Sequence, residues 1–299
     1  MRHVYECPVR WADLDLLGHV NNVVYVDYLQ EARVDMLRVH APDRRVDDLA
    51  EGVVVVRHEV SYLAPLDFRF RPVRIECWVT EIRAASFTIA YEVVDDTDSG
   101  RTTYLRATTV LTPYVFGTER PRRLTDDERA GLQRFYEPGE RVARAPRPVV
   151  PRRPEAHYDM HVRFSDVDVY GHVNNVKYFE YFQEARIAMM SRLAEGLTER
   201  AVYSVPGSGG LRSVVAQIDV DYHVPILFRR DSYDLWTQVE RVGTTSMTLV
   251  AEICDGETVL SRARVVVVFW DSEAQRPTRP PEALRERLVA LSDDPGSAG

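Results

Sequence analysis

The chain contains 299 residues, which is long for one ordinary domain and suits two domains of about 150 residues. Hydrophobic residues make up 45% and charged residues 28%, a composition typical of a folded globular protein rather than a disordered one. The net charge of −8 argues against a nucleic-acid or anionic-membrane partner as the main role. No apolar run approaches the roughly 18 residues of a membrane span.

The N-terminus and the cysteines bear on the cellular compartment. Residues 1–6 contain no apolar signal-peptide core, so the sequence predicts a cytoplasmic protein. Cys7, Cys77 and Cys254 are odd in number and lie far apart. Their spacing excludes a disulfide framework and a cysteine zinc site, and it fits a reducing cytosol. No metal is expected.

In chain order, the first half opens with a predicted strand at about 4–10 and a Gly-Asn loop at 18–22. A helix follows, because apolar side chains then recur every three or four residues. Segments rich in β-branched and aromatic residues predict four strands, and a last helix has Thr125 as its N-cap. One long helix with antiparallel strands indicates an α+β domain in which a curved sheet wraps the helix. The helical positions are Tyr25, Tyr28, Leu29, Ala32, Met36 and Leu37, the strands are 53–63, 73–82, 87–94 and 102–111, and the last helix is 125–135.

The second half repeats the first. Residues 9–33 and 162–186 are identical at 16 of 25 positions, and the predicted elements recur in the same order. Between the halves, a stretch with five prolines and five arginines predicts an extended linker. The sequence therefore predicts a first domain at 1–137, a linker at 138–156, a second domain at 157–291 and a frayed tail at 292–299.

The most informative repeated segment is D-x-D-x-x-G-H-V-N-N, at residues 13–22 and 166–175. It lies where a predicted strand gives way to the start of the long helix. The glycine permits backbone conformations that are closed to other residues. Free N–H groups at the helix start can bind a developing negative charge. A carboxylate four residues before the histidine can act as a nucleophile or a general base.

This motif, with its helix and a Tyr-x-x-Pro strand end in each half, resembles the 4-hydroxybenzoyl-CoA thioesterase-like family of hotdog-fold acyl-CoA thioesterases. The resemblance implies two tandem hotdog domains that form an intramolecular pseudo-dimer. It also implies that the second aspartate of each D-x-D pair, Asp15 or Asp168, is the catalytic carboxylate. The backbone amides of Asn22 and Asn175 would then stabilise the oxyanion.

The other residues of the motif have alternative roles. Asp13 and Asp166 are better candidates for a turn or a cap than for catalysis. His19 and His172 could orient the aspartate or the thioester carbonyl, or serve the structure alone. The first asparagine of each Asn-Asn pair is expected to hydrogen-bond the loop itself. The candidate oxyanion and positioning residues are Gly18, His19, Asn21, Asn22, Gly171, His172, Asn174 and Asn175.

A second pair of carboxylates, Glu31 and Glu184, lies about two helical turns further on. Some hotdog thioesterases place their catalytic carboxylate on this helix, so the resemblance makes these two glutamates second-choice catalytic residues. The interpretation that we prefer is an ion pair with Arg33 or Arg186, or with a neighbouring strand.

The chain departs from the family at the β-turn where benzoyl-CoA members grip nucleotide phosphates with a basic cluster. The matching stretches, 82–87 and 242–247, hold one arginine and none. Arg83 and the nearby Arg241 are therefore the candidate contacts for coenzyme A phosphates. Acyl-carrier protein stays open as an alternative thioester donor.

The predicted function is hydrolysis of acyl-CoA or acyl-carrier-protein thioesters, with coenzyme A only as part of the substrate and no other cofactor. A hotdog enoyl-CoA hydratase or dehydratase is the runner-up. It is disfavoured because hydratases of this fold resemble D-x-N-P-x-H, with the histidine five residues after the aspartate instead of four. The third alternative is a non-catalytic acyl-binding protein. Further homo-oligomerisation of the double-hotdog unit is left open.

Overall fold

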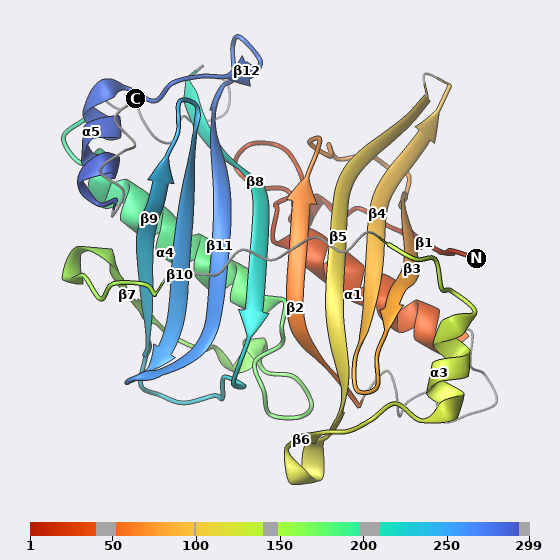
Figure 1. Cartoon of the computed structure of the whole chain (residues 1–299). Helices are drawn as coiled ribbons and strands as arrows, with labels where there is room; N and C mark the ends of the chain where they lie inside the picture. Colours follow the sequence, from red (N-terminus) through yellow and green to blue (C-terminus); the bar gives the residue numbers. More distant parts are fainter. Residues whose placement is uncertain (40–51, 99, 140–148, 198–209, 293–299) are drawn as a thin grey trace. The chain divides into compact units, whose positions relative to one another are not determined.

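The computed structural model describes residues 1–39, 52–98, 100–139, 149–197 and 210–292 (Figure 1). The chain divides into two units, Met1–Ala145 and Pro146–Gly299, and each is described by itself. Most of the predicted linker, at 140–148, and nearly all of the predicted tail, at 293–299, lie outside the described residues.

The first unit is built on a five-stranded antiparallel sheet with the order β1-β3-β4-β5-β2. At its centre, Tyr91 pairs with Cys77 on one neighbouring strand and Ala107 on the other. The strands are β1 at His3–Cys7, β2 at Val53–Tyr62, β3 at Val73–Ile82, β4 at Phe87–Thr97 and β5 at Gly100–Val115, and the two-residue β6, Arg120–Pro121, pairs with β5.

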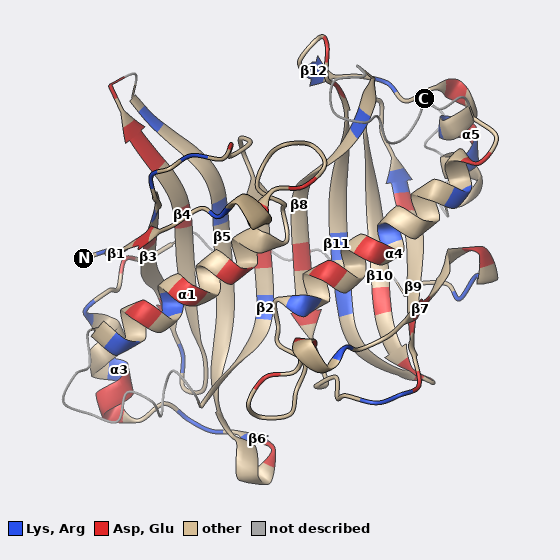
Figure 2. Cartoon of the chain, turned by 180° about the vertical axis from the view of Figure 1, so that it is seen from behind, with Lys and Arg blue, Asp and Glu red and all other residues tan. Residues whose placement is uncertain are grey.

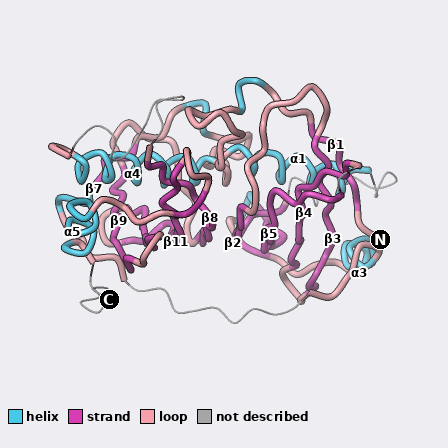
Figure 3. The backbone as a smooth tube through the Cα atoms, turned by 90° about the horizontal axis from the view of Figure 1, so that it is seen from above, coloured by secondary structure: helices cyan, strands magenta, loops and turns pink. Residues whose placement is uncertain are grey.

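The long helix α1, Val24–Val39, lies along one face of this sheet and packs on β1 and β3 (Figure 1; Figure 2; Figure 3). Its buried side chains recur every three or four residues, as a helix that covers a sheet requires. Every apolar position predicted for this face is buried, so the helical pattern is confirmed. The buried residues are Tyr25, Val26, Tyr28, Leu29, Ala32, Arg33, Met36 and Leu37.

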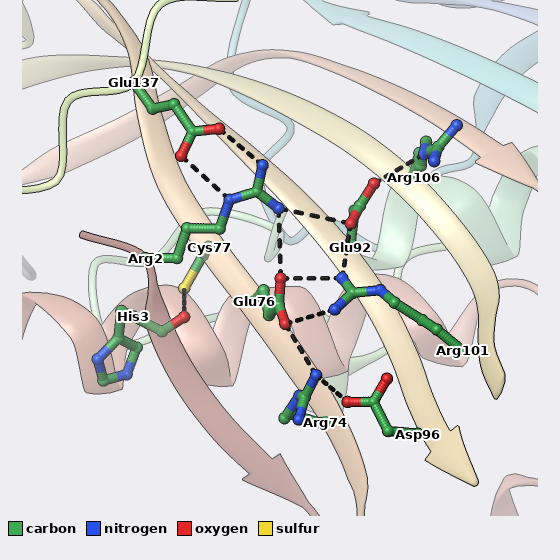
Figure 4. A network of polar contacts seen from close by, with 10 residues as sticks. All are labelled: Arg2, His3, Arg74, Glu76, Cys77, Glu92, Asp96, Arg101, Arg106 and Glu137. Carbon is green, nitrogen blue, oxygen red and sulfur yellow. Dashed lines mark hydrogen bonds and ion pairs between the residues drawn. The ribbon is translucent and has the colours of Figure 1, made fainter. Parts of the chain in front are cut away.

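The opposite face of the sheet carries a network of ion pairs (Figure 4). Side chains alternate along β3, so Glu76 points away from the apolar face. Its carboxylate accepts hydrogen bonds from Arg101 and Arg2. Arg101 also pairs with Glu92, and the Arg2 guanidinium lies 3.6 Å from the Trp78 ring centroid. These contacts, the hydrogen bonds from Arg101 above all, hold the pKa of Glu76 below its ordinary value.

The shorter helix α3, Asp126–Gln133, packs against β3. The Thr125 hydroxyl accepts a hydrogen bond from the Glu128 N–H at 3.2 Å, and the Glu128 carboxylate accepts the Thr125 N–H at 2.8 Å. This reciprocal pair satisfies two of the N–H groups that a helix start leaves unpaired. The predicted N-cap is therefore confirmed.

The second unit repeats this architecture, with a five-stranded antiparallel sheet in the order β7-β9-β10-β11-β8. At its centre Ala251 pairs with Thr237 and Ala263. The strands are β7 at His157–Met160, β8 at Leu211–Tyr222, β9 at Tyr233–Val242, β10 at Ser246–Asp255 and β11 at Thr258–Asp271, and β12, Arg276–Pro277, pairs with β11.

The second unit also repeats the helices. The long helix α4, Lys177–Ala194, packs on β7 and β9, and α5, Glu282–Ala290, packs on β9 and α4. Short 3-10 turns occur at η2, Phe116–Thr118, and at η3, Pro154–Ala156. The two halves of the sequence therefore produce the same α+β fold twice.

The element bounds differ from the predicted ones mainly at strand ends. The first strand ends at Cys7 instead of residue 10, because Pro8 has no N–H to donate to the sheet. By contrast, β4 and β5 run beyond the predicted 87–94 and 102–111. They pair with each other up to the Thr97–Gly100 pair, and the other end of β5 pairs with β2 and β6.

Candidate active site

In each unit, a tight loop stands between the first strand and the long helix. In the first unit it follows the 3-10 turn η1, Trp11–Asp13. The Gly18 N–H donates to the Asp15 carbonyl at 3.0 Å, and the Asp15 N–H donates to the His19 carbonyl at 3.0 Å. Gly18 has a φ of +83°, in the left-handed region that favours glycine. The loop therefore turns back within a few residues and leaves Asp15 at its base.

The second unit builds the same loop after the 3-10 turn η4, Phe164–Asp166. The Gly171 N–H donates to the Asp168 carbonyl at 3.1 Å, and the Asp168 N–H donates to the His172 carbonyl at 2.8 Å. Gly171 has a φ of +81°. The repeated sequence motif is thus a repeated backbone conformation.

Asp13 is only 2% exposed and anchors the loop of the first unit. Its carboxylate accepts hydrogen bonds from the Arg10 N–H at 2.7 Å, from the Arg10 side chain at 3.0 Å and from the Tyr28 hydroxyl. Burial acts to raise the pKa of Asp13. The hydrogen bonds from Arg10 and Tyr28 outweigh it and leave the pKa below its ordinary value.

Asp166 repeats the backbone and tyrosine contacts in the second unit. Its carboxylate accepts the Arg163 N–H and the Tyr181 hydroxyl, each at 2.8 Å. The first aspartate of each D-x-D pair is therefore a buried anchor, as the turn role predicted for it requires.

The second aspartate of each pair is half-buried, and its side chain closes the turn. Asp15 Oδ1 accepts the Leu17 N–H at 2.8 Å. Asp168 Oδ1 accepts the Tyr170 N–H at 2.9 Å and the His172 N–H at 3.3 Å. Within the described residues, Asp168 engages no partner through its other oxygen, Oδ2. A carboxylate oriented through one oxygen can accept a proton through the other.

The asparagine pair follows at the start of the long helix. Asn21 Oδ1 accepts the Val23 N–H, and Asn174 Oδ1 accepts the Val176 N–H, both at 3.3 Å. The first asparagine of each pair thus hydrogen-bonds its own loop, as predicted.

The backbone carbonyl of the second asparagine in each pair accepts a hydrogen bond from a tyrosine of the sheet. The Tyr62 hydroxyl, at the end of β2, donates to the Asn22 carbonyl at 2.7 Å. The Tyr222 hydroxyl, at the end of β8, donates to the Asn175 carbonyl at 2.8 Å. These bonds locate the peptide groups beside the candidate oxyanion amides.

The two histidines have different neighbours. His19 bridges to Asp67 along the backbone, and His19 Nε2 lies 3.5 Å from Asp67 Oδ1. His172 makes the same backbone bridge to Leu227, which carries no carboxylate. The loop is further pinned by the Val173 N–H, which donates to the Ile226 carbonyl at 2.8 Å.

The preferred interpretation of Glu31 and Glu184 as ion-pair partners of Arg33 and Arg186 is wrong. Both glutamates are exposed on their helices, and both arginines are buried. Within the described residues, neither glutamate forms an ion pair. The physical reason is that residues two apart on a helix point in different directions. The second-choice catalytic assignment of the glutamates stays a prediction.

The candidate phosphate contacts differ in their partners. Arg83 forms an ion pair with Glu81 at 3.0 Å, and its N–H closes the β3–β4 turn on the Ser86 carbonyl at 2.8 Å. Arg241 is exposed near the end of β9 and forms no ion pair with any described residue.

The remaining reactive groups are buried or dispersed. Burial raises the pKa of Cys7 and of Cys77 to about 12, and that of Cys254 to about 11, so none of them offers a ready thiolate. Across the described ranges, no cluster of three or more His, Cys, Asp or Glu side chains could hold a metal ion. None of the described helices has the length and apolar content to cross a membrane.

Sequence reasoning missed the tyrosines that organise the site. The spacing of Tyr28 and Tyr181, each 15 residues after its anchoring aspartate, is the same in both halves and could have indicated that link. Tyr62 and Tyr222 were noted only as part of a strand-end pattern. Their partners lie 40 and 47 residues earlier in the chain, a separation that no local pattern reveals.

Comparison with known proteins now places this site in a family. Residues 9–146 and 162–288 match the thioesterase-like superfamily, and the chain belongs to that superfamily with its domain present twice. A Bacillus subtilis (strain 168) relative, the uncharacterized protein YsmA, is 31% identical over 108 residues. That match covers 36% of this chain and 67% of the relative.

Solved structures match nearly the whole chain. A protein described as an oleoyl thioesterase, from Lactobacillus plantarum, aligns with a TM-score of 0.70 at 15% identity over 90% of this chain and 96% of that one. The 12:0-ACP thioesterase from Umbellularia californica aligns with a TM-score of 0.67 at 15% identity, over 90% and 94%. At this identity the likeness shows the fold, which is two tandem hotdog domains.

Proposed function

We propose that this thioesterase-like protein hydrolyses acyl thioesters of coenzyme A or of acyl-carrier protein, with Asp15 and Asp168 as the catalytic carboxylates. The observation that carries the proposal is that the two aspartates of each D-x-D pair differ in burial and in hydrogen bonding. The first aspartate is buried and accepts hydrogen bonds from the N–H that opens the turn and from a tyrosine hydroxyl of the long helix. The second is half-buried and oriented by its own turn beside the helix start.

In the proposed reaction, the aspartate takes a proton from water while the water oxygen attacks the thioester carbonyl carbon. The carbonyl oxygen becomes an oxyanion, which the backbone N–H of Asn22 or Asn175 and the positive end of the helix stabilise. The C–S bond then breaks, and the leaving thiolate takes the proton from the aspartic acid. The products are a carboxylic acid and a free thiol.

The chain's other groups assist in this scheme. Gly18 and Gly171 allow the left-handed turn that brings the aspartate to the helix start. Asn21 and Asn174 cap the loop. His19 and His172 are proposed as positioning groups. The backbone carbonyl of each accepts its aspartate's N–H, so each histidine lies next to that aspartate. Arg83 and Arg241 remain candidates for coenzyme A phosphates.

The test is a substitution series assayed on a panel of acyl-CoA and acyl-carrier-protein thioesters. Asp15→Asn and Asp168→Asn should each remove part of the hydrolysis. The double variant should lose about a hundredfold or more of kcat/KM, the range typical of a lost general base. Asp98→Asn, at the exposed turn after β4, is the matched control and should keep full activity.

Three outcomes would count against the proposal. A double variant with wild-type turnover would remove the aspartates from catalysis. Hydration of enoyl-CoA without thioester hydrolysis would indicate the hydratase alternative. Tight binding of acyl-CoA with no turnover would indicate an acyl-binding protein.

The domain bounds are proposed as 1–137 and 157–291, joined by the linker 138–156. The two compact units and the two family matches support a division into two domains, although the first unit ends at Ala145 and the first match at residue 146, within the proposed linker. The pairing of the domains as a pseudo-dimer, further oligomerisation and a cytoplasmic location stay predictions. Small-angle scattering, light scattering and cell fractionation test them in turn.

A further inference from the structure

An exposed aromatic pair stands beside the candidate catalytic loop of the second unit. Phe164 is 82% exposed and Phe228 is 49% exposed. Their ring centroids are 5.9 Å apart, with the rings at 86° to each other. Phe164 begins the turn that ends at Asp166, and Phe228 follows Leu227, which bridges to His172. The pair therefore borders the loop that holds Asp168.

Two arginines flank these rings in the sequence. Arg163 directly precedes Phe164, and Arg230 lies two residues after Phe228. Both are exposed, and neither guanidinium forms an ion pair with any other residue that the structure describes. Their neighbour Arg229 differs, because it pairs with Asp255 at 2.9 Å and lies 3.6 Å from the centroid of the Tyr233 ring.

The first unit lacks this combination at the same place. Trp11 and Phe68 form the corresponding aromatic pair, with ring centroids 5.3 Å apart. Arg10, however, is tied to Asp13 at 2.8 Å. Phe70, fully exposed, stands where the second unit has Arg230. The first unit thus presents rings beside an arginine that is already paired, and the second presents rings beside arginines that pair with no other described residue.

Exposed rings and arginines that are neighbours in the chain suit one class of ligand. An exposed aromatic face can stack on a heterocyclic base, and a guanidinium binds phosphate oxygens through two parallel hydrogen bonds. The positive charge is confined to the two arginines, because Asp231 directly follows Arg230 and the chain carries a net charge of −8. A positive charge limited to two side chains fits a small anionic ligand better than it fits the broad surface of an acidic protein.

We propose that Phe164, Phe228, Arg163 and Arg230 form the subsite for the phosphorylated adenosine end of coenzyme A at the site of the second unit. The subsite rests on the proposed function, because it assigns the donor of the thioester that Asp168 would cleave. It also locates nucleotide recognition away from the β-turns that hold Arg83 and Arg241.

The test compares two substrates with the same acyl group, one on coenzyme A and one on N-acetylcysteamine, which has no nucleotide. The variant is Arg163→Ala/Arg230→Ala. Its KM for the acyl-CoA should rise about tenfold, the loss expected when charge-assisted phosphate contacts disappear. Its kcat and its kinetics on the N-acetylcysteamine thioester should stay within about twofold of wild type.

The control is Arg279→Ala, which removes an exposed arginine of the same unit that forms no ion pair with any described residue. Arg279 follows Thr278, whose N–H bonds to the Phe269 carbonyl. Phe269 pairs with Ser213, near the opposite end of β8 from Tyr222 and the loop that follows it. This variant should behave as wild type. Because the arginines are exposed, the folded state should survive, and the single variant Arg230→Glu provides a second test.

A second readout separates this proposal from the proposed function. Calorimetry with adenosine 3′,5′-bisphosphate should show binding to the wild type, and binding about tenfold weaker in the double variant. If no thioester is hydrolysed but the nucleotide binds in this pattern, the proposed function fails and the subsite stands. An unchanged KM for acyl-CoA with unchanged nucleotide binding would overturn the subsite. So would an equal loss on both small thioesters, or a loss confined to acyl-carrier-protein substrates.

Discussion

Two aspartates that stand two residues apart in the sequence have different environments. Asp13 is buried and accepts hydrogen bonds from Arg10 and Tyr28. Asp15 is half-buried and accepts a hydrogen bond from a backbone N–H of its own turn. The same division holds for Asp166 and Asp168. At this scale the local backbone, more than the residue type, decides which carboxylate serves the structure and which one can react.

The lowered pKa of Asp13 predicts how stability depends on pH. Its ionised form is favoured in the folded state, so its contribution is complete above the unfolded pKa of about 3.9 and is lost as pH falls through the lower folded value. Asp13→Asn should lower the free energy of unfolding by about 1–3 kcal/mol at pH 7. Urea unfolding between pH 7 and pH 3 should show that difference shrink below pH 4.

The control for this measurement is Asp98→Asn, because Asp98 is exposed in a turn. Its unfolding midpoint should follow that of the wild type at every pH. A deficit of Asp13→Asn that stays constant down to pH 3 would contradict a role for the ionised carboxylate.

At the scale of elements, the end of one strand holds the start of one helix. Tyr62 ends β2 and Tyr222 ends β8, and each hydroxyl donates to the carbonyl just before the helix. This bond limits the rotation of the peptide groups next to the candidate oxyanion donors. Stabilisation of an oxyanion depends on such preorganisation.

Removal of both hydroxyls should therefore affect the chemical step more than substrate binding. We expect Tyr62→Phe/Tyr222→Phe to lower kcat about tenfold or more with little change in KM, because the oxyanion forms only in the transition state. Steady-state kinetics on one acyl-CoA checks this, with Tyr136→Phe as the control. A matching rise in KM, or a kcat loss that follows a drop in melting temperature, would make the tyrosines structural only.

At the scale of the whole molecule, the two units share one backbone fold but differ in some core residues. In the first unit, Thr109 and His58 face each other across β5 and β2, are fully buried and share a hydrogen bond of 2.9 Å. The register of the second sheet places Val265 and Ile218 at the corresponding positions. The copies have kept their strand pairing, while one pair of facing core residues is polar in the first unit and apolar in the second.

This difference predicts a non-additive response to substitution. Thr109→Val alone should cost about 1–3 kcal/mol, because it removes a hydrogen-bond partner of a buried histidine. His58→Ile/Thr109→Val, which copies the second unit, should recover part of that loss, because both polar groups then go together. A double-mutant cycle by denaturant unfolding measures the coupling. Additive losses would show that the two side chains act independently.

Local patterns predicted much of each unit. Helical spacing placed the buried face of α1, the repeat placed the long helix and the main strands of the second unit, and Thr125 marked a helix start. Such features depend on neighbours within a few residues, and the sequence displays those directly. The prediction failed where it paired Glu31 with Arg33, since helix geometry turns side chains two apart in different directions.

The sequence by itself determined the duplication, the α+β class, the glycine turn and the resemblance to hotdog thioesterases. The tertiary structure alone decided which side chains meet. Phe164 and Phe228 are 64 residues apart in the chain, and Tyr62 is 40 residues from the Asn22 carbonyl that it holds. Contacts of this kind arise when β-sheet register and helix packing close long loops, and residue spacing carries no record of that register.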